Sequence, residues 1–363
     1  MTTTEKGDTM RPTPNAQRPT PNLHACPNLG ERIHIALAVH DSSGTYSQHA
    51  GVTMTSIFEN TSSPVTIHLL HDNTLTQENR EKFIRTAQKY SQEIEFIDMS
   101  KYSEYLTAEL QKMSKRLTIG TLYRAFIPQL LPNIDKVIYF DCDVIVNLDI
   151  SELWNIDLEN KSIAAVFDII NNMSPLSVYG LEKKICGIDI KKYINTGVLL
   201  INSEKIRKNG NFFEQVKNWL LHYHDFAPSF DQDAINSILA DDIKFIDSKF
   251  NLWDLSKDVS NSIIHMFNGK PWEGFTGREH EKIYWRMYLK SAWGEDNTIN
   301  NLIDKLAQMN ISSAHYIHPN GGKCVKRLIN SLKIRLPSIL YILTVPYMFI
   351  KYFIVQIKYK FSR

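Results

Sequence analysis

The sequence predicts an α/β fold, with one domain built on a mostly parallel, mixed sheet flanked by helices. Short apolar segments of strand length alternate with longer segments of helical character over most of the 363 residues. Aspartates also follow three of the apolar segments, at Asp41, at Asp141 with Asp143, and at Asp168. Open α/β sheets bind ligands beyond the carboxyl ends of their strands, so these aspartates predict a ligand site at one sheet edge.

Three strands are expected in the first hundred residues, at His34–Val39, Val65–Leu70 and Ile94–Ile97. The first leads into a polar turn and then a helix that ends near Asn60. The second leads to Thr76, which is placed to cap a helix reaching Tyr90. This βαβαβ order with short connections predicts that the three strands pair in parallel.

The alternation continues in the second half of the chain. Helices are expected at Thr121–Leu131, where Pro132 ends the helix, and at Phe212–His222 and Asp231–Leu239. Further strands are expected at Lys136–Phe140, Ile163–Phe167, Gly197–Ile201 and Ile263–Met266.

Charge is distributed unevenly along the chain. Residues 322–363 contain nine basic residues and no acidic one, whereas the whole chain has a formal net charge of only +2. The remaining residues are therefore net acidic, which gives no reason to expect a nucleic-acid partner. Residues 1–31 are rich in Pro, Thr and Asn, lack an apolar signal segment and contain RPTPN twice, so we expect a disordered extension. These features divide the chain into an extension at 1–31, a catalytic domain at 32–321 and a basic tail at 322–363.

The tail contains the apolar and aromatic segment Leu336–Ile357, which is long enough for a membrane span. Pro346 interrupts this segment and Lys351 lies inside it, so an amphipathic segment lying on anionic lipid is favoured over a span or a helix packed in the core. The four cysteines are scattered and form no CxxC pair, which favours a reducing compartment. We therefore expect a cytoplasmic protein that associates peripherally with the inner face of the cytoplasmic membrane.

Asp141-Cys142-Asp143 lies between two apolar runs, where a strand stops. Two carboxylates spaced by one residue can both reach one divalent cation such as Mn²⁺ or Mg²⁺, which can then complete its shell with diphosphate oxygens. A solvated turn is the alternative for such a short motif. His265 follows another apolar run and is a candidate third ligand, although a lone histidine is also common in a core.

Ser229-Phe230-Asp231-Gln232-Asp233 precedes a predicted helix. Asp231 is placed to be the N-cap of this helix, which would be a structural role. A neighbouring carboxylate and amide could instead bind sugar hydroxyls or stabilise an oxocarbenium-like centre. On the sequence alone the two interpretations stand side by side.

The ordered series LYRAFIPQLLP, DKVIYFDCDVIV, LWNIDL, INTGVLLIN, FDQDAIN and IIHMFNGKPW resembles glycosyltransferase family 8, in particular bacterial lipopolysaccharide α-galactosyl- and α-glucosyltransferases. The resemblance covers about His34 to Trp272. It implies a GT-A nucleotide-diphospho-sugar transferase fold and a retaining, Mn²⁺-dependent transfer of glucose or galactose from a UDP-sugar to a glycan or glycolipid. One departure is that the segment from His265 to Lys270 is one residue shorter than the usual H-x-x-G-x-x-K-P-W pattern.

The resemblance also implies roles for individual residues. Asp141, Asp143 and His265 would bind the metal, and Asp168 would contact the acceptor. Asp231, Gln232 and Asp233 would act at the reacting sugar. The implied donor-binding residues are Ala38, His40, Ser42, Arg124, Asp141, Cys142, Asp143, Asn195, Thr196, Gly197, Asp231, Gln232, Gly269 and Lys270.

Other functions remain to be compared with this one. A sugar-nucleotide pyrophosphorylase usually has a basic, glycine-rich N-terminal loop, whereas the loop after Val39 has Gly44 and no nearby basic residue. A glycogenin-like glucosyltransferase would show the same motifs, but the basic tail favours a lipid-borne acceptor. A non-catalytic carbohydrate- or membrane-binding protein is disfavoured by the intact set of Asp141, Asp143 and His265.

Overall fold

The computed structural model describes residues 31–296, except for 107–109, 111–118, 169–177, 224, 268 and 275. Most of the extension predicted at 1–31, the C-terminal part of the domain predicted at 32–321 and the whole basic tail lie outside the described residues. Within the described ranges, none of the helices is both long and apolar enough to cross a bilayer.

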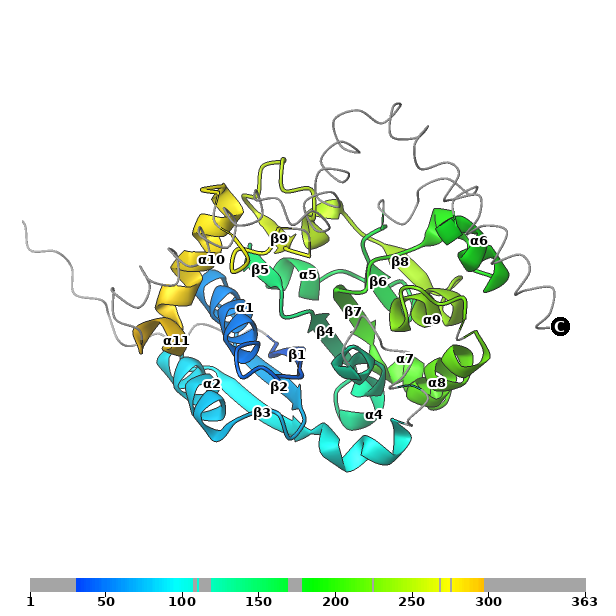
Figure 1. Cartoon of the computed structure of the whole chain (residues 1–363), viewed down its shortest axis with the longest axis horizontal. Helices are drawn as coiled ribbons and strands as arrows, with labels where there is room; N and C mark the ends of the chain where they lie inside the picture. Colours follow the sequence, from blue (N-terminus) through cyan, green and yellow to red (C-terminus); the bar gives the residue numbers. More distant parts are fainter. Residues whose placement is uncertain are drawn as a thin grey trace, which may run out of the picture.

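Seven strands form the central sheet, in the order β3-β2-β1-β4-β7-β6-β8 (Figure 1). The strands are β1 (Ile33–Val39), β2 (Val65–His71), β3 (Glu93–Asp98), β4 (Lys136–Phe140), β6 (Ile163–Ala165), β7 (Val198–Asn202) and β8 (Ile243–Phe245). Strands β3, β2, β1 and β4 pair in parallel, β7 is antiparallel to both of its neighbours, and β8 is parallel to β6. The predicted α/β fold with a mixed, mostly parallel sheet is confirmed.

The strands have apolar side chains on both faces because helices cover both sides of the sheet (Figure 1). In β1, Ile35 and Leu37 pack into one core, whereas Ala36 between them packs into the other. The first core includes α1 (Ser47–Asn60), α10 (Glu279–Lys290) and α11 (Ala292–Glu295), and α2 (Gln77–Lys89) contributes Phe83 to it. The second core includes α7 (Ser203–Lys208), α8 (Phe212–His222) and α9 (Asp231–Ile238). The shorter elements are η1 (Met99–Tyr105), η2 (Ile119–Phe126), α4 (Ile127–Leu130), α5 (Ser151–Trp154), α6 (Val178–Ile185), η3 (Ile190–Lys192) and η4 (Ser248–Asn251).

Most predicted elements agree with the structure to within two residues, and Thr76 caps α2 by accepting the N–H of Asn79 at 3.1 Å. The segment predicted to be helical at Thr121–Leu131 is helical, but a 3-10 helix, η2, fills its first half and α4 begins only at Ile127. Pro128 lies in the first turn of α4, where the missing N–H of proline is no loss. Of the two interpretations of Asp231, the N-cap role does not hold, because Phe230 occupies that position with a φ of 51°.

A second, two-stranded sheet pairs β5 (Val144–Asn147) with β9 (Ser262–His265) in antiparallel register. This register places Val144 opposite His265. The turn Asp141-Cys142-Asp143, called the D-x-D motif below, directly precedes β5. The pairing therefore brings His265 beside this motif, which lies far earlier in the chain.

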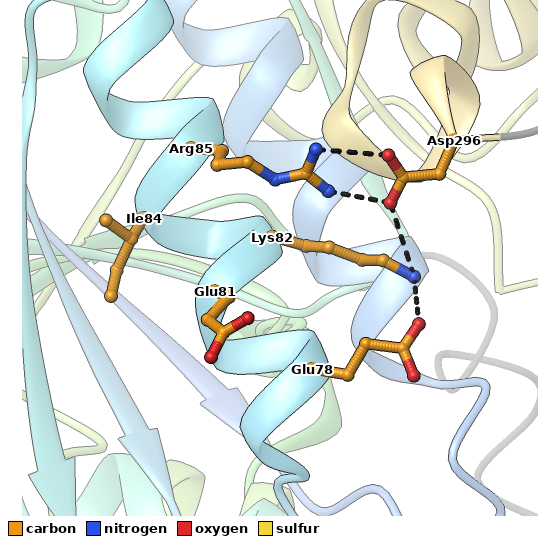
Figure 2. Close-up of a pocket in the computed structure, with 6 residues that line it drawn as sticks. All are labelled: Glu78, Glu81, Lys82, Ile84, Arg85 and Asp296. Carbon is orange, nitrogen blue, oxygen red and sulfur yellow. Dashed lines mark hydrogen bonds and ion pairs between the residues drawn. The ribbon is translucent and has the colours of Figure 1, made fainter.

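Ion pairs hold the end of the described chain against α2. Asp296 forms ion pairs with Arg85 at 2.6 Å and Lys82 at 3.7 Å, and Lys82 also pairs with Glu78 (Figure 2). These four residues line a surface pocket beside α2. The pairs dock α11 against α2 and take no part in the cluster of aspartates at the sheet edge.

Candidate active site

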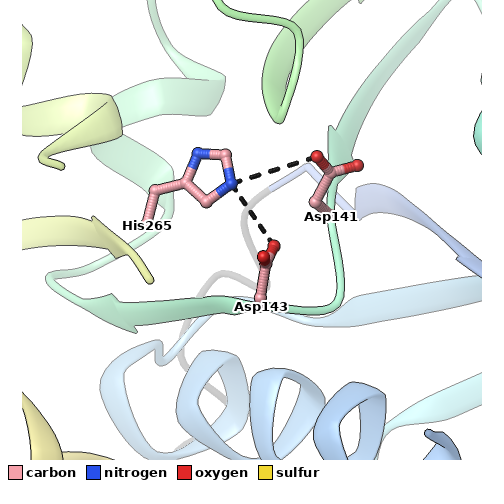
Figure 3. Close-up of side chains that lie close together, drawn as sticks. All are labelled: Asp141, Asp143 and His265. Carbon is pink, nitrogen blue, oxygen red and sulfur yellow. Dashed lines mark ion pairs between the residues drawn. The ribbon is translucent and has the colours of Figure 1, made fainter. Parts of the chain in front are cut away.

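Asp141, Asp143 and His265 converge at the ends of β4, β5 and β9 (Figure 3). The Nε2 atom of His265 lies 3.3 Å from Oδ1 of Asp143 and 4.0 Å from Oδ2 of Asp141. One ligand atom from each residue lies within 4.8 Å of the others. Asp143 and His265 are buried, and Asp141 is half-buried. The structure therefore brings the three predicted metal ligands together, and we refer to them as the acidic cluster.

A chain of amides fixes the imidazole of His265. The backbone N–H of Gly197 donates to Oδ1 of Asn195 at 2.9 Å, and Asn251 Nδ2 donates to the same oxygen at 2.9 Å. This leaves Oδ1 of Asn251 facing Nδ1 of His265, also at 2.9 Å. The imidazole must donate from Nδ1, so its Nε2 lone pair points into the acidic cluster and is available to a cation.

Opposite charges stabilise the ionised form of Asp143. Burial alone would raise the pKa of this carboxyl group, but His265 and the ammonium of Lys270, 3.0 Å away, hold it well below its usual range. For His265, burial lowers the pKa and the two carboxylates outweigh it, so that its pKa is raised. Two carboxylates and one imidazole nitrogen in a buried corner form a donor set that suits a divalent cation.

Gly197 lies directly against the acidic cluster. A Cβ atom at this position would overlap the ring of His265 and lie 2.9 Å from Oδ2 of Asp141. The backbone N–H of Asp141 donates to the carbonyl of Gly197 at 2.8 Å, which extends the pairing of β4 with β7. The absent side chain therefore leaves the room in which a cation and its ligand would sit.

The buried guanidinium of Arg124 connects the acidic cluster to α9. It lies 3.2 Å from Oδ1 of Asp141 and 2.9 Å from Oδ2 of Asp231, and it donates to the Thr196 carbonyl at 2.6 Å. Its carbon lies 4.6 Å from the ring centre of Tyr139, whose hydroxyl donates to Asp141 at 2.7 Å. Arg124 thus binds two carboxylates and a carbonyl at once, as a guanidinium does better than an ammonium.

Asp231, Gln232 and Asp233 differ in exposure although they are consecutive. Asp231 and Asp233 are buried, whereas Gln232 is partly accessible. Burial, together with the charge of Asp141, raises the pKa of Asp231 to about 6 against the opposing effect of Arg124. Of these three residues, Gln232 is therefore the one placed to meet a ligand with its side chain.

The amide of Gln232 bridges two other predicted site residues. Its Oε1 accepts the backbone N–H of Thr196 at 3.1 Å, and its Nε2 donates to Oδ2 of Asp168 at 3.2 Å. Thr196 precedes Gly197, which lies against the acidic cluster, so the Gln232 amide is hydrogen-bonded to the backbone next to that cluster. The structure therefore brings Asp168, the predicted acceptor contact, into the same site.

The residues at the end of β1 lie at this edge of the sheet as well. His40 contacts Oδ2 of Asp72 at 2.6 Å and is half-buried, whereas Ser42 is exposed. Cys142 is buried and donates its S–H to the Ala38 carbonyl at 3.1 Å, so its thiol faces the core. Asp41 caps the start of α1 by accepting the N–H groups of Tyr46 and Ser47 at 2.6 and 3.1 Å. Asp41 therefore has a structural role and does not join the acidic cluster.

Gly269 and Lys270 follow β9 in a turn. Gly269 has a φ of +92°, a conformation that favours glycine, and Lys270 contacts Asp143 as described above. Lys270 is therefore in place beside the acidic cluster even with its shortened spacing from His265.

Several residues of this site are absent from the sequence-based prediction. Asn251, Tyr139, Tyr193 and Lys183 contact predicted site residues directly, and all four are buried. Tyr139 lies in the apolar run before the D-x-D motif. A hydroxyl so close to that motif could have indicated a residue of the site. Asn251 and Lys183 stand in segments without a local pattern, and only tertiary contacts reveal them.

Comparison with known proteins agrees with this geometry. The sequence profile described as glycosyl transferase family 8 matches residues 35–275. A putative glycosyltransferase of Haemophilus influenzae is 29% identical over 221 residues, which are 61% of this chain and 64% of that protein. General stress protein A of Bacillus subtilis is 28% identical over 295 residues, which cover 75% of this chain and 97% of that protein. This chain thus matches less than two thirds of the length of the Haemophilus relative.

Solved structures share the fold. The galactosyltransferase LgtC, in complex with donor and acceptor sugar analogs, superposes with a TM-score of 0.60 at 21% identity, over 76% of this chain and all of that one. The bifunctional glycosyltransferase WbbM superposes with a TM-score of 0.61 at 17% identity, over 78% of this chain and 53% of that one. The α/β architecture is therefore the GT-A fold of glycosyltransferases. Since the family profile covers most of the described domain, the chain belongs to glycosyl transferase family 8.

Proposed function

We propose that this protein transfers a hexose, glucose or galactose, from a UDP-sugar to a lipopolysaccharide or another cell-surface glycan, with retention of anomeric configuration. The observation that supports this most is the buried acidic cluster at a sheet edge, with Arg124 and Gln232 connected to it. LgtC, which shares the fold, is a galactosyltransferase whose structure holds donor and acceptor sugar analogs, and this agrees with a hexose donor and a glycan acceptor.

Asp141, Asp143 and His265 would hold Mn²⁺ or Mg²⁺. When bound, such an ion supplies Lewis-acid stabilisation to the departing diphosphate. Arg124 keeps the carboxylates of Asp141 and Asp231 in place, and Lys270 brings a second positive charge to the phosphate side of the cluster. Gln232, whose side chain is partly accessible, would offer its amide to the donor sugar.

We propose same-face attack by the acceptor, with the leaving β-phosphate taking the proton. The geometry disfavours Asp233 as a nucleophile, since it is buried and Lys183, Tyr193 and the N–H of Ser229 all donate to its oxygens. The amide of Gln232 is itself a weak nucleophile. Intact-protein mass spectrometry after mixing with donor alone should show no glycosyl adduct, and a trapped adduct would reject same-face attack.

The direct test of the function is a panel of nucleotide sugars read out as released nucleoside diphosphate. We expect release of UDP from UDP-glucose or UDP-galactose with Mn²⁺, little release with EDTA, and a loss on the order of 100-fold or more for Asp143→Asn. The exposed Asp258→Asn is the matched control. Formation of a sugar nucleotide from a sugar phosphate would instead indicate a pyrophosphorylase, and glycan binding without UDP release would indicate a non-catalytic protein.

The acceptor proposal extends to the membrane. Residues 322–363 have nine basic residues and no acidic one, and each basic residue near an anionic surface contributes about 1 kcal/mol of attraction. We infer that this segment holds the enzyme on the inner face of the cytoplasmic membrane. Replacing Lys323, Lys326, Arg327, Lys333 and Arg335 by Gln in the full chain should abolish sedimentation with anionic vesicles and leave UDP release intact. Unchanged sedimentation would reject this role.

A further inference from the structure

A fully buried ion pair lies behind Gln232. Lys183, on α6, has no exposed surface, and its ammonium contacts Oδ1 of Asp233 at 2.5 Å. The same ammonium lies 3.8 Å from the ring centre of Tyr193. Apolar replacements of buried ion pairs are often neutral or stabilising, because removing two charges from water is costly. The pair therefore calls for a role other than stability.

Asp233 is the acceptor in its hydrogen bonds with Lys183, Tyr193 and Ser229. A carboxylate only accepts, and Asp233 accepts from Lys183 and the Tyr193 hydroxyl at Oδ1 and from the Ser229 N–H at Oδ2. Burial and the charge of Asp233 raise the pKa of Tyr193 well above its ordinary value, so the phenol keeps its proton. The Tyr193 hydroxyl donates this proton to Asp233 at 2.5 Å, so the phenol oxygen can accept a hydrogen bond from another group.

Gln232 donates to that oxygen, as does the side chain of Ser229. The Nε2 atom of Gln232 donates to the Tyr193 hydroxyl at 3.1 Å and to Asp168 at 3.2 Å, while its Oε1 accepts the Thr196 N–H at 3.1 Å. The orientation of the amide is thus set at one end by a backbone donor and at the other by two acceptors, the Tyr193 hydroxyl oxygen and the Asp168 carboxylate. The partly accessible amide stands at the end of a relay that begins at the ammonium of Lys183.

We propose that Lys183 is a positioning residue for sugar transfer, which orients the Gln232 amide through Asp233 and Tyr193. The inference rests on the proposed function, because it takes Gln232 to lie beside the donor sugar. The ammonium of Lys183 pairs with the Asp233 carboxylate, the carboxylate fixes the direction of the Tyr193 hydroxyl, and that hydroxyl accepts from the nitrogen of the amide, which also donates to Asp168.

The loss of Lys183 would reverse this relay. A carboxyl group buried without a counter-charge takes up a proton, and protonated Asp233 would become a donor to Tyr193. The Tyr193 proton would then point at the Gln232 nitrogen, which is itself a donor, so two donors would meet and the amide would lose its contact with Tyr193. Only Asp168 and the N–H of Thr196 would then hold the amide, and its position beside the donor sugar would be less well defined.

The kinetic test uses four variants. Lys183→Met should lower kcat about 100-fold at acid pH, with little change in the KM for the donor, because misplacement of a positioned group by about 1 Å has that effect. Its kcat should recover as pH rises and Asp233 loses its proton, in a limb additional to the one that Asp231 gives the wild-type enzyme. Lys183→Met combined with Asp233→Leu removes both charges, so it should fold, and its low kcat should show no such limb. Tyr193→Phe should lower kcat similarly, and adding it to the double variant should cause no further loss.

The matched control is Lys244→Met, which removes an ammonium paired with Glu159 on the surface. It should leave kcat and the pH profile unchanged. The inference is overturned if the Lys183→Met and Asp233→Leu double variant retains the wild-type kcat, or if Tyr193→Phe adds its full loss to that of the double variant. Should Lys183→Met alone not fold, these two results still decide the matter.

A second readout needs no turnover. The side-chain amide signals of ¹⁵N-labelled glutamine can be assigned to Gln232 by their absence in Gln232→Ala. They should shift in the double variant and in Tyr193→Phe, and stay unchanged in Lys244→Met. If these shifts occur while the wild-type enzyme releases no nucleotide from any nucleotide sugar, the proposed function fails and the relay stands. If the enzyme is active and the signals do not shift, the relay fails alone.

Discussion

Asn251 accepts a hydrogen bond from Nδ1 of His265 at 2.9 Å, across a separation of 14 residues in the chain. This contact makes Nδ1 the donor, so in the neutral imidazole the other ring nitrogen, Nε2, carries the lone pair and is directed at Asp141 and Asp143. Asn251 therefore prepares the imidazole as a ligand without touching the cation itself.

Replacing Asn251 by Leu should weaken Mn²⁺ binding by about 10- to 100-fold, the usual effect of losing the partner of a ligating histidine. Isothermal titration calorimetry with Mn²⁺ and UDP measures the change. The side chain of Asn209, at the end of α7, offers the control Asn209→Leu. Equal affinities of the two variants would show that the imidazole needs no partner.

Gly197→Ala should abolish metal binding while the protein still folds. The new methyl group would overlap the His265 ring and crowd Asp141, so the ring would have to leave the cluster. Gly274→Ala is the control, because a Cβ there meets open space and its φ is not in the left-handed region. Circular dichroism should show both variants folded, and Mn²⁺-dependent UDP release should be lost only in the first. Normal release by Gly197→Ala would contradict the proposed position of the cation.

Arg124→Lys should reduce kcat by about 100-fold or more, since an ammonium cannot contact Asp141, Asp231 and the Thr196 carbonyl together. Steady-state kinetics with the donor measure this loss. Arg207→Lys, at a site that binds three carbonyls away from the acidic cluster, should leave kcat unchanged. A normal kcat for Arg124→Lys would mean that charge alone suffices at this position.

The contribution of His40 to stability should depend on pH. Its hydrogen bond to Asp72 raises the His40 pKa above the value of 6.5 expected in the unfolded chain, so the stabilisation is fully present below about pH 6.5 and is lost as pH rises through the folded pKa. For Asp72, burial would raise the pKa, but His40 and Thr74 outweigh it and lower it. The stabilisation due to Asp72 is therefore present at neutral pH and fades only in acid.

Urea unfolding of wild type and His40→Gln should thus differ more at mildly acid pH than at mildly alkaline pH. His222→Gln, at the exposed end of α8, serves as the control and should show the same difference under both conditions. If His40→Gln lowered the free energy of unfolding more at higher pH, the pH dependence would have the opposite sign. The ion pair with Asp72 would then be rejected as its source.

The sequence predicted the sheet and the acidic cluster because both depend on local signals. Apolar runs of strand length mark β1, β2 and β4, and Asp141 and Asp143 follow β4 directly. The apolar run before His265 made it a candidate ligand, but no local pattern shows that β9 pairs with β5, so only the family resemblance implied that it joins the two aspartates. Two asparagines position His265. Asn195 lies in the motif INTGVLLIN and could be predicted, whereas Asn251 lies in no motif and could not.

Elsewhere tertiary structure overrides the local pattern. The segment at 121–131 has helical periodicity, yet Pro128 and the packing of Arg124 into the site divide it into η2 and α4. Asp231 has the residue type of an N-cap, but it lies inside the helix because Arg124 draws its carboxylate toward Asp141. Lys183 is the strongest case, since a lysine with no local pattern around it is completely buried.

The register that places Val144 opposite His265 has a thermodynamic consequence. The three donor side chains are neighbours only in the folded chain, so a cation held by them has almost no affinity for the unfolded one. Its binding therefore adds to the free energy of unfolding, by about 2.7 kcal/mol when the free cation is at roughly a hundred times its dissociation constant. The melting temperature would therefore report how much of the enzyme has bound the cation, without any transfer of sugar.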